Sequence, residues 1–363
     1  MSRPRLIVVG PLPPPIHGVT VSTTLVLANP YLRERFVIEH LDTSDHRDAQ
    51  NVGRWDVTNI RVGIANLMRL TRMLRGSRGV LYLPISQSSG AFLRDSFFIR
   101  MANASGWRVG IHLRGSEFWR FYTRQRRPYR RWTRLTLARV SAAAVLGESL
   151  RHAFGDLVST ERIAVVPNGT PPNRAGDSIR DTRCVVFLSN LRRRKGVTEA
   201  LDAALMALRE VPSARVIFVG TWEDERLERD LRSAAAGMRG VEFRPSVSGS
   251  AKDELLATAG ILLFPPREPE GHPRVVLEAM AAGLPVVTTD RGAIAETVRD
   301  GITGFVLPDP DPVELAGRLV SLLTDEDLYK RMSTAARSEY EAKYTQTAAD
   351  ARLADWLVDV ATR

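Results

Sequence analysis

The sequence has little of several features that mark particular protein classes. One cysteine in 363 residues, Cys184, excludes an internal disulfide and a multi-cysteine metal cluster. None of the six histidines stands in a zinc-enzyme spacing such as HxxxH. No apolar run reaches the roughly 18 residues that a membrane span needs, and the N-terminus shows no signal-peptide pattern. We therefore expect a soluble, cytoplasmic protein.

Length and composition predict an ordinary folded protein. Apolar residues make up 44% of the 363 positions and charged residues 25%, which argues against a disordered chain. At roughly 100 to 200 residues per domain, this length predicts two domains with sizeable cores. Because Cys184 stands in an apolar run, we expect it to be a small buried side chain.

Positive charge is concentrated in the first half of the chain. Residues 1–170 hold 25 Arg, no Lys and 11 acidic residues, a net charge of +14, whereas residues 171–363 hold 26 basic and 30 acidic residues, a net charge of −4. Eight arginines lie from Arg120 to Arg139, interleaved with aromatic residues. Such a stripe suits an anionic membrane surface or a nucleic acid, and a solvated helical face explains it equally well. The aromatic residues are Phe118, Trp119, Phe121, Tyr122, Tyr129 and Trp132.

Short β-branched runs alternate with longer amphipathic stretches, which predicts a parallel sheet with crossover helices in each half. A Pro/Gly/polar stretch, residues 167–181, separates the two series. Two doubly wound domains of this kind bind ligands in a cleft at the carboxyl ends of their strands. The helical tail is expected to pack back across the first domain. The predicted strands are 6–9, 36–39, 79–83, 109–113, 143–146, 163–166, 184–188, 215–219, 241–243, 261–264, 286–288 and 304–306.

Two loops carry residues suited to binding an anion. After the first strand, Gly18 and the amides of a helix start could approach a phosphate, although the loop matches neither the dinucleotide nor the P-loop fingerprint. After the first strand of the second series, Arg194 and Lys195 stand at a helix start, where cations favour a phosphate. Taken alone, the first loop could also be an ordinary strand-to-helix connection, and the second could also be a solvated turn without a ligand.

The most informative segment covers residues 265–285. A loop carries Glu270, and a helix that starts near Pro273 carries Glu278 one turn in, so both carboxylates can face the same side. Carboxylates commonly bind the vicinal hydroxyls of a ribose or a sugar ring. Taken singly, Glu278 could also be an ordinary exposed residue of a helix. Glu270 could also be an acidic residue near a helix start, where the helix dipole favours negative charge.

Together these residues resemble the retaining glycosyltransferases of family 4, which have the GT-B fold. The resemblance rests on Lys195-Gly196, on Glu270 and Glu278 with the following Ala-Met-Ala-Ala-Gly-Leu-Pro-Val, and on Pro167-Asn168-Gly169. It covers nearly the whole chain and is most specific in residues 160–310. It implies two Rossmann-like doubly wound domains that face a cleft. Residues 1–170 would bind the acceptor, residues 171–345 the nucleotide sugar, and residues 346–363 would form a helix on the first domain.

The resemblance also implies roles for individual residues. Lys195, Glu270 and His112 would be catalytic, with Lys195 at the diphosphate and Glu270 at the donor sugar, while Glu278 would bind the ribose. Some relatives have a second histidine where Arg114 stands, so either His112 or Arg114 could face the sugar. The expected acceptor-binding residues are His17, Arg114 and Asn168. The other expected donor-binding residues are Gly18, Ser189, Asn190, Arg194, Arg244, Pro245, Val247, Gly271, His272, Pro273, Arg274 and Val275.

The implied activity is glycosyl transfer with retention, in which Lys195 stabilises the departing diphosphate. Asp309-Pro310-Asp311 fits a metal-binding DxD pattern, but an Asp followed by Pro312 predicts a helix cap, so we expect neither a metal nor a cofactor. A UDP-sugar is the favoured donor and a GDP-sugar the second choice. The acceptor would be a hydroxyl of a cell-surface glycan, a glycolipid or a secondary metabolite.

Two other functions also fit the sequence. One is a non-catalytic protein that binds sugar nucleotides or polyanions, and the other is a sugar-nucleotide hydrolase or epimerase on the same scaffold. For the stripe from Arg120 to Arg139 we expect an anionic membrane surface as partner and no nucleic acid. That partner implies a peripheral position at the inner face of the membrane.

Overall fold

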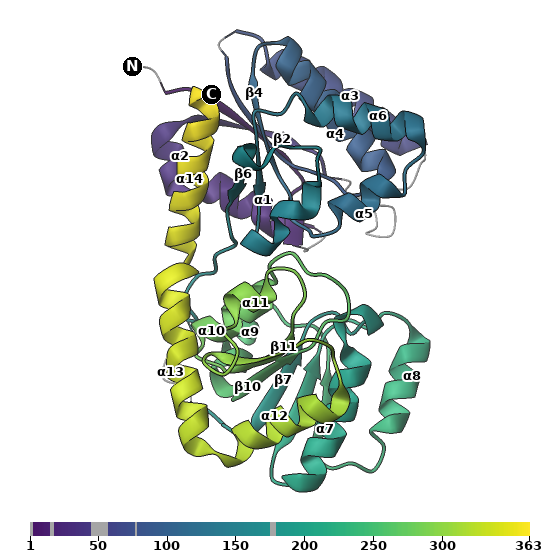
Figure 1. The fold of residues 1–363 in the computed structure, drawn as a ribbon, viewed down its shortest axis with the longest axis vertical. Helices are drawn as coiled ribbons and strands as arrows, with labels where there is room; N and C mark the ends of the chain where they lie inside the picture. Colours follow the sequence, from purple (N-terminus) through teal and green to yellow (C-terminus); the bar gives the residue numbers. More distant parts are fainter. Residues whose placement is uncertain (1–2, 15–17, 45–56, 77, 175–178) are drawn as a thin grey trace. The chain divides into compact units, whose positions relative to one another are not determined.

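The structure is a computed structural model that describes residues 3–14, 18–44, 57–76, 78–174 and 179–363 (Figure 1). The chain divides into two compact units. Unit 1 consists of Met1–Pro167 and Ala349–Arg363, and unit 2 of Asn168–Ala348. Unit 1 is therefore assembled from two separate stretches of sequence.

Unit 1 is built on a parallel six-stranded sheet with the order β2-β1-β3-β4-β5-β6. Most of its strands are almost continuous apolar runs, as expected where both faces of a parallel sheet are covered. The strands are β1 (Arg5–Gly10), β2 (Val37–Asp42), β3 (Gly79–Pro84), β4 (Arg108–His112), β5 (Ala142–Val145) and β6 (Ile163–Val165).

The helices of unit 1 follow the strands as crossovers, and the last helix of the chain joins them. Leu353, Trp356, Leu357 and Val360 of that helix, α14, are buried in one cluster with side chains of β1 and β3, so α14 completes the core of unit 1. The helices are α1 (Gly18–Ala28), α2 (Pro30–Arg35), α3 (Val57–Met73), α4 (Ser89–Ala104), α5 (Phe118–Thr123), α6 (Arg127–Leu137), η2 (Glu148–Phe154), η3 (Thr160–Arg162) and α14 (Gln346–Thr362).

Unit 2 repeats the design with the strand order β12-β11-β10-β7-β8-β9, and its pairs are again parallel. Cys184 at the start of β7 is buried, and this burial raises the pKa of its thiol to about 11. The strands are β7 (Cys184–Leu188), β8 (Arg215–Val219), β9 (Val241–Arg244), β10 (Ile261–Phe264), β11 (Val286–Thr289) and β12 (Gly304–Leu307).

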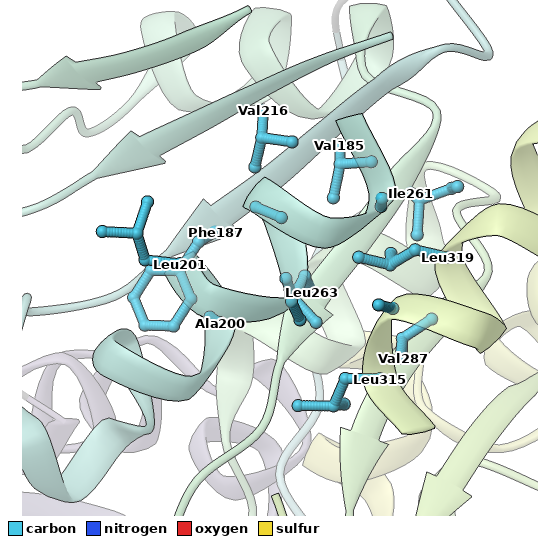
Figure 2. Packing of buried hydrophobic residues seen from close by; sticks show 14 of the residues in the cluster. Val185, Phe187, Ala200, Leu201, Val216, Ile261, Leu263, Val287, Leu315 and Leu319 are labelled. Atoms are coloured by element: carbon cyan, nitrogen blue, oxygen red, sulfur yellow. The ribbon is translucent and has the colours of Figure 1, made fainter. Parts of the chain in front are cut away.

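Two helical layers cover the sheet of unit 2. Figure 2 shows one of them, in which Val185 and Val287 of the sheet belong to the same packed cluster as Leu315 and Leu319 of α12. A second cluster joins the sheet to buried residues of α9, α10 and α13. The helices are η4 (Arg193–Lys195), α7 (Val197–Glu210), α8 (Glu225–Ala234), α9 (Ser250–Thr258), α10 (Arg274–Ala281), α11 (Ile294–Thr297), α12 (Pro312–Thr324) and α13 (Glu326–Lys343).

The predicted fold class, two Rossmann-like doubly wound domains, is confirmed. Each of the predicted strands forms, and each series makes a parallel sheet. In the part of the chain that the structure describes, no helix combines the length and the apolar character needed to cross a bilayer.

Candidate functional site

The candidate site of unit 2 lies at β7, where the strand order of the sheet reverses. Strand β7 pairs with β8 on one side and with β10 on the other, so the connections that follow β7 and β10 leave the sheet at neighbouring carboxyl ends. This switch point is where doubly wound sheets bind their ligands. The loop after β7 leads to Lys195, and the loop after β10 leads to Glu270.

Lys195 and Glu270 form an ion pair at this point. The Lys195 Nζ atom lies 2.5 Å from Glu270 Oε1, and each side chain is only 17% exposed. The same ammonium group lies 5.7 Å from the centre of the Phe264 ring, at the end of β10. Two residues that the sequence predicts to bind the donor therefore meet across 75 positions of sequence.

Close backbone packing holds the loop that carries Glu270. A Cβ atom on Gly292, where φ is +66°, would lie 1.6 Å from the Glu270 carbonyl oxygen, and the Ala293 N–H donates to the Gly271 carbonyl at 3.1 Å. The hydroxyl of Thr289 donates to the Pro266 carbonyl at 2.6 Å. These contacts fix the backbone and leave the Glu270 side chain to interact with Lys195.

Glu278, the second predicted carboxylate, is also paired with a lysine. Lys252 Nζ of α9 lies 2.6 Å from Glu278 Oε1 of α10, with side chains 27% and 18% exposed. Lys252 was not predicted from the sequence as a site residue. The rarity of lysine could have drawn attention to this residue, because only four of the 51 basic side chains are lysine.

His272 is held in a buried hydrogen-bond network. Its Nδ1 accepts from the Asn168 N–H at 3.0 Å, and its Nε2 lies 2.9 Å from the Thr297 hydroxyl. The Asn168 side-chain amide donates to the His272 carbonyl at 2.8 Å. Because an N–H can only donate, Nδ1 carries no proton and the ring proton sits on Nε2. The structure thus places His272 and Asn168, predicted for donor and acceptor respectively, in contact with each other.

The remaining predicted residues of unit 2 have other partners or lie partly or fully exposed. Arg274 donates to the Gly169 carbonyl at 2.7 Å, and the Arg194 carbonyl accepts from the Arg267 N–H at 3.1 Å. Arg244 donates to both carboxylate oxygens of Glu242, at 2.6 and 2.7 Å. Gly271, Pro273, Val275, Ser189 and Val247 are partly buried, and Asn190 and Pro245 are exposed.

In unit 1, His112 ends β4 and belongs to a buried cluster. Its Nδ1 lies 3.1 Å from the Tyr82 hydroxyl, which also accepts a hydrogen bond from Arg114 at 3.0 Å. Trp356 of α14 packs edge-on to the His112 ring, with ring centres 6.0 Å apart. Gly18 is exposed at the start of α1, and His17 lies outside the described residues. The sequence analysis missed Tyr82 and Trp356, whose contacts depend on tertiary packing.

The environment of His112 disfavours its charged form. Burial lowers its pKa well below the ordinary histidine value, the positive charge of Arg114 lowers it further, and an interaction with the Val166 backbone opposes both. His112 is therefore a neutral imidazole at physiological pH.

The DxD pattern takes part in local structure. Asp311 accepts hydrogen bonds from the N–H groups of Val313 and Glu314, both at 3.0 Å, and so caps α12 as predicted. Asp309 forms an ion pair with Arg291 at 2.6 Å. Across residues 3–14, 18–44, 57–76, 78–174 and 179–363, no three His, Cys, Asp or Glu side chains gather in a way that could hold a metal ion.

Sequence comparison relates unit 2 to known enzymes. Residues 173–339 match the family model described as glycosyl transferases group 1. A phosphatidyl-myo-inositol mannosyltransferase of Mycobacterium leprae is 32% identical over 188 residues, which cover 49% of this chain and 49% of that enzyme. The chain thus spans about half the length of this curated relative.

Solved structures match nearly the whole chain. Anabaena Alr3699/HepE in complex with UDP has a TM-score of 0.75 at 16% identity, covering 98% of this chain and 100% of that one. A glycosyltransferase from Rickettsia africae ESF-5 has a TM-score of 0.76 at 12% identity, covering 99% of each chain. The chain therefore has the GT-B fold of these solved proteins, and its residues 173–339 are similar in sequence to the glycosyl transferases of group 1.

Proposed function

We propose that this protein is a retaining, metal-independent glycosyltransferase that uses a nucleoside-diphosphate sugar. The observation that carries the proposal is the meeting of Lys195 and Glu270 at the switch point of unit 2, within the segment that matches the family. A UDP-sugar is favoured over a GDP-sugar because solved proteins of this fold are described with UDP and UDP-glucose.

The ion pair supplies chemistry suited to this reaction. Lys195 and Glu270 neutralise each other in their ion pair. A bound diphosphate would compete for the Lys195 ammonium, which would then stabilise the negative charge that develops on the leaving group. Glu270, released from the lysine, would accept hydrogen bonds from hydroxyls of the donor sugar. The acceptor oxygen would bond to the anomeric carbon on the face from which the diphosphate departs, as the bond from that carbon to the phosphate oxygen breaks, and the hydroxyl proton would pass to the departing phosphate.

A cation supplied by the chain removes the chemical need for a divalent metal. Lys195 provides positive charge at the site, and the two carboxylates of the DxD pattern are engaged by the α12 cap and by Arg291. For the acceptor we propose a hydroxyl of a cell-surface glycan, a glycolipid or a secondary metabolite.

The test is transfer measured with purified protein, UDP-glucose or a GDP-sugar, and a panel of glycan and glycolipid acceptors, with and without EDTA. We expect selective stabilisation by one nucleoside diphosphate and metal-independent transfer with retained anomeric configuration. At 100 times its dissociation constant, a ligand stabilises a protein by about 2.7 kcal/mol, which gives a clear thermal shift.

Other results would point to other functions. Binding of a nucleotide sugar without turnover would indicate a binding protein, and release of free sugar or an epimerised nucleotide sugar would indicate a hydrolase or an epimerase. Inactivation by EDTA with recovery on adding Mg²⁺ would contradict metal independence.

We further propose that the layer formed by α3, α4 and α6 of unit 1 binds an anionic membrane surface. Figure 1 shows these helices in unit 1, where α4 contacts both α3 and α6. The three helices hold nine arginines and one acidic residue. That acidic residue, Asp95, is buried and paired with Arg94. The layer therefore has a large excess of positive charge.

The apolar side chains that are exposed in the structure differ from those that the sequence predicted to lie at a membrane. Phe118, Phe121 and Tyr122 are buried in the core, so three of the six aromatic residues predicted to lie at an interface are unavailable, while Trp119 is 39% exposed. Exposed apolar side chains come instead from the three helices: Ile64, Met68, Phe97 and Leu135 are 51%, 54%, 41% and 50% exposed. Apolar side chains scattered among arginines suit a lipid headgroup region.

Vesicle co-sedimentation tests this surface directly. We expect binding to phosphatidylserine-containing vesicles and not to phosphatidylcholine alone, with loss at high salt. Reversing Arg127 and Arg131 to Glu should weaken binding at least about tenfold, at about 1 kcal/mol per charge. Arg226 and Arg229 of α8, which are also exposed, give the matched control. Equal weakening by both double variants, or preference for single-stranded RNA over vesicles, would reject the membrane proposal.

A further inference from the structure

We infer that Arg291 is a positioning residue of the candidate donor site, which fixes the loop that carries Glu270 to the loops on either side of it. The inference rests on the proposed function, in which Glu270 binds the donor sugar and Lys195 the diphosphate. Arg291 was not predicted from the sequence as a site residue. Its partner Asp309, the first carboxylate of the DxD pattern, thereby gains a part in building the site.

The first support is the number of loops that the Arg291 side chain joins. Its Nε donates to the Arg267 carbonyl, in the loop after β10, at 3.0 Å. Its Nη1 donates to the Asp290 and Pro308 carbonyls, in the loops after β11 and β12, at 2.8 and 2.7 Å. Its Nη2 donates to Asp309 Oδ1 at 2.6 Å. A single side chain, only 22% exposed, therefore joins the loops after three neighbouring strands.

The second support is that these hydrogen bonds continue to the loop of Lys195. The Arg267 N–H donates to the carbonyl of Arg194, the residue before Lys195, at 3.1 Å. The Arg267 side chain also pairs with Glu199 of α7, at 2.5 Å. The connection therefore crosses the carboxyl edge of the sheet in the order of its strands, β12, β11, β10 and β7. Lys195 and Glu270 belong to the loops after the last two of these strands.

The third support is that the backbone next to Arg291 packs against the backbone of Glu270. A Cβ atom on Gly292 would lie 1.6 Å from the Glu270 carbonyl oxygen. The Ala293 N–H donates to the Gly271 carbonyl at 3.1 Å. The loop is thus held before Glu270 by the Arg291 side chain, and at Glu270 and beyond by the residues that follow Arg291.

The contacts of Arg291 indicate that it acts on the loop rather than through its charge. Its charge is paired with Asp309, and three of its four acceptors are backbone carbonyls. A lysine would keep the charge but has only one nitrogen, so it could replace only part of this set. Loss of the remaining contacts would let Glu270 move relative to Lys195, and a misplacement of about 1 Å can cost about 100-fold in rate.

The experiment compares Arg291→Lys and Arg180→Lys with the wild-type protein. Arg180 donates to the carbonyls of Ala282 and Gly283, which precede β11, so it is a matched control at the opposite edge of the same sheet. Hydrogen exchange of the amides of residues 267–272 reports on the loop directly. We expect this exchange to be at least about fivefold faster in Arg291→Lys, the size expected for losing one hydrogen bond, and unchanged in Arg180→Lys.

Steady-state kinetics with UDP-glucose as the donor measure the effect on the site. In Arg291→Lys we expect a higher KM for the donor and a fall in kcat/KM of at least about tenfold, with the KM for the acceptor unchanged. A protein that was only less stable would lose kcat, because fewer molecules are folded, and would keep both KM values. Arg180→Lys should keep the wild-type KM for the donor.

Several results would overturn the inference while the proposed function stood. These are wild-type exchange of residues 267–272 in Arg291→Lys, a wild-type KM for its donor, or equal changes in Arg180→Lys. If Arg291→Lys does not fold, Asp309→Ala replaces it, because it removes one of the four acceptors, and wild-type exchange in that variant overturns the inference. A wild-type protein that binds neither UDP nor GDP would reject the proposed function, and the exchange measurement would still decide whether Arg291 holds the loop.

Discussion

The backbone of Gly196 lies directly against the carbonyl group of Pro265. A Cβ atom on Gly196 would be 1.8 Å from the Pro265 oxygen, and the φ angle of Gly196 is +75°. Gly196 follows Lys195, and Pro265 begins the loop that leads to Glu270. The contact of these two backbones therefore allows the loops after β7 and β10 to bring the lysine and the carboxylate together.

Replacing Gly196 by alanine should disturb both stability and the site. The added methyl group would clash with Pro265, and a left-handed backbone costs an L-residue about 1–2 kcal/mol in addition. We expect a loss of stability above that amount, measured by urea unfolding, and a higher KM for the donor. Gly237→Ala is the control, because its φ is +80° and nothing lies within 4 Å. Equal losses in the two variants would show that the contact with Pro265 is unimportant.

Removing either partner of the Lys195–Glu270 pair should reduce transfer. Lys195→Ala removes the cation proposed to stabilise the leaving group, and losses of about 100- to 1,000-fold in kcat are typical for such groups. Glu270→Gln keeps the shape of the side chain but removes its charge, and we expect a smaller loss. Product formation with the preferred donor measures both, and Lys330→Ala on the surface of α13 is the control. Full activity in Lys195→Ala would reject its assigned role.

Local patterns in the sequence predicted the strands and singled out the candidate site residues, because each depends on a short run. The β-branched runs form the sheets, and Lys195, Glu270 and Glu278 are recognisable from their neighbours in the chain. Lys252 was missed because it reaches Glu278 across 26 residues from another helix. The burial of Phe118, Phe121 and Tyr122 was not predicted, because alternation of aromatic residues with arginines does not say which side chains a short helix turns inward.

Lowering the pH should destabilise the protein through His112. Its pKa in the folded state lies well below the ordinary 6.5, mainly because it is buried. As the pH falls below about 6.5, the unfolded chain takes up a proton that the folded protein does not bind, so stability present above that pH is lost below it, by up to about 1.4 kcal/mol per pH unit. Unfolding measured at pH 5.5 and 7.5 should show a smaller decrease for His112→Asn, which keeps a polar group near Tyr82. Identical pH dependence in the two proteins would contradict this account.

The C-terminal helix should be essential to the stability of unit 1. Trp356 is buried against Tyr82 and His112, and replacing a buried tryptophan by alanine typically costs about 3–5 kcal/mol. Val358, on the same helix, is 37% exposed, and we expect Val358→Ala to cost less than about 0.5 kcal/mol. Thermal unfolding of the two variants checks the difference. Similar melting temperatures would mean that α14 contributes little to the core.

The division of unit 1 into two stretches also determines the order in which the protein can be made. Residues 168–348 of unit 2 are contiguous, so they can fold as soon as they leave the ribosome, whereas unit 1 lacks α14 until residues 349–363 have been made. At about 5–20 residues per second, translating the intervening unit takes roughly 10 to 40 seconds. During that interval the nascent first sheet exposes the apolar surface that Leu353, Trp356, Leu357 and Val360 later cover, which makes it a natural binding site for chaperones.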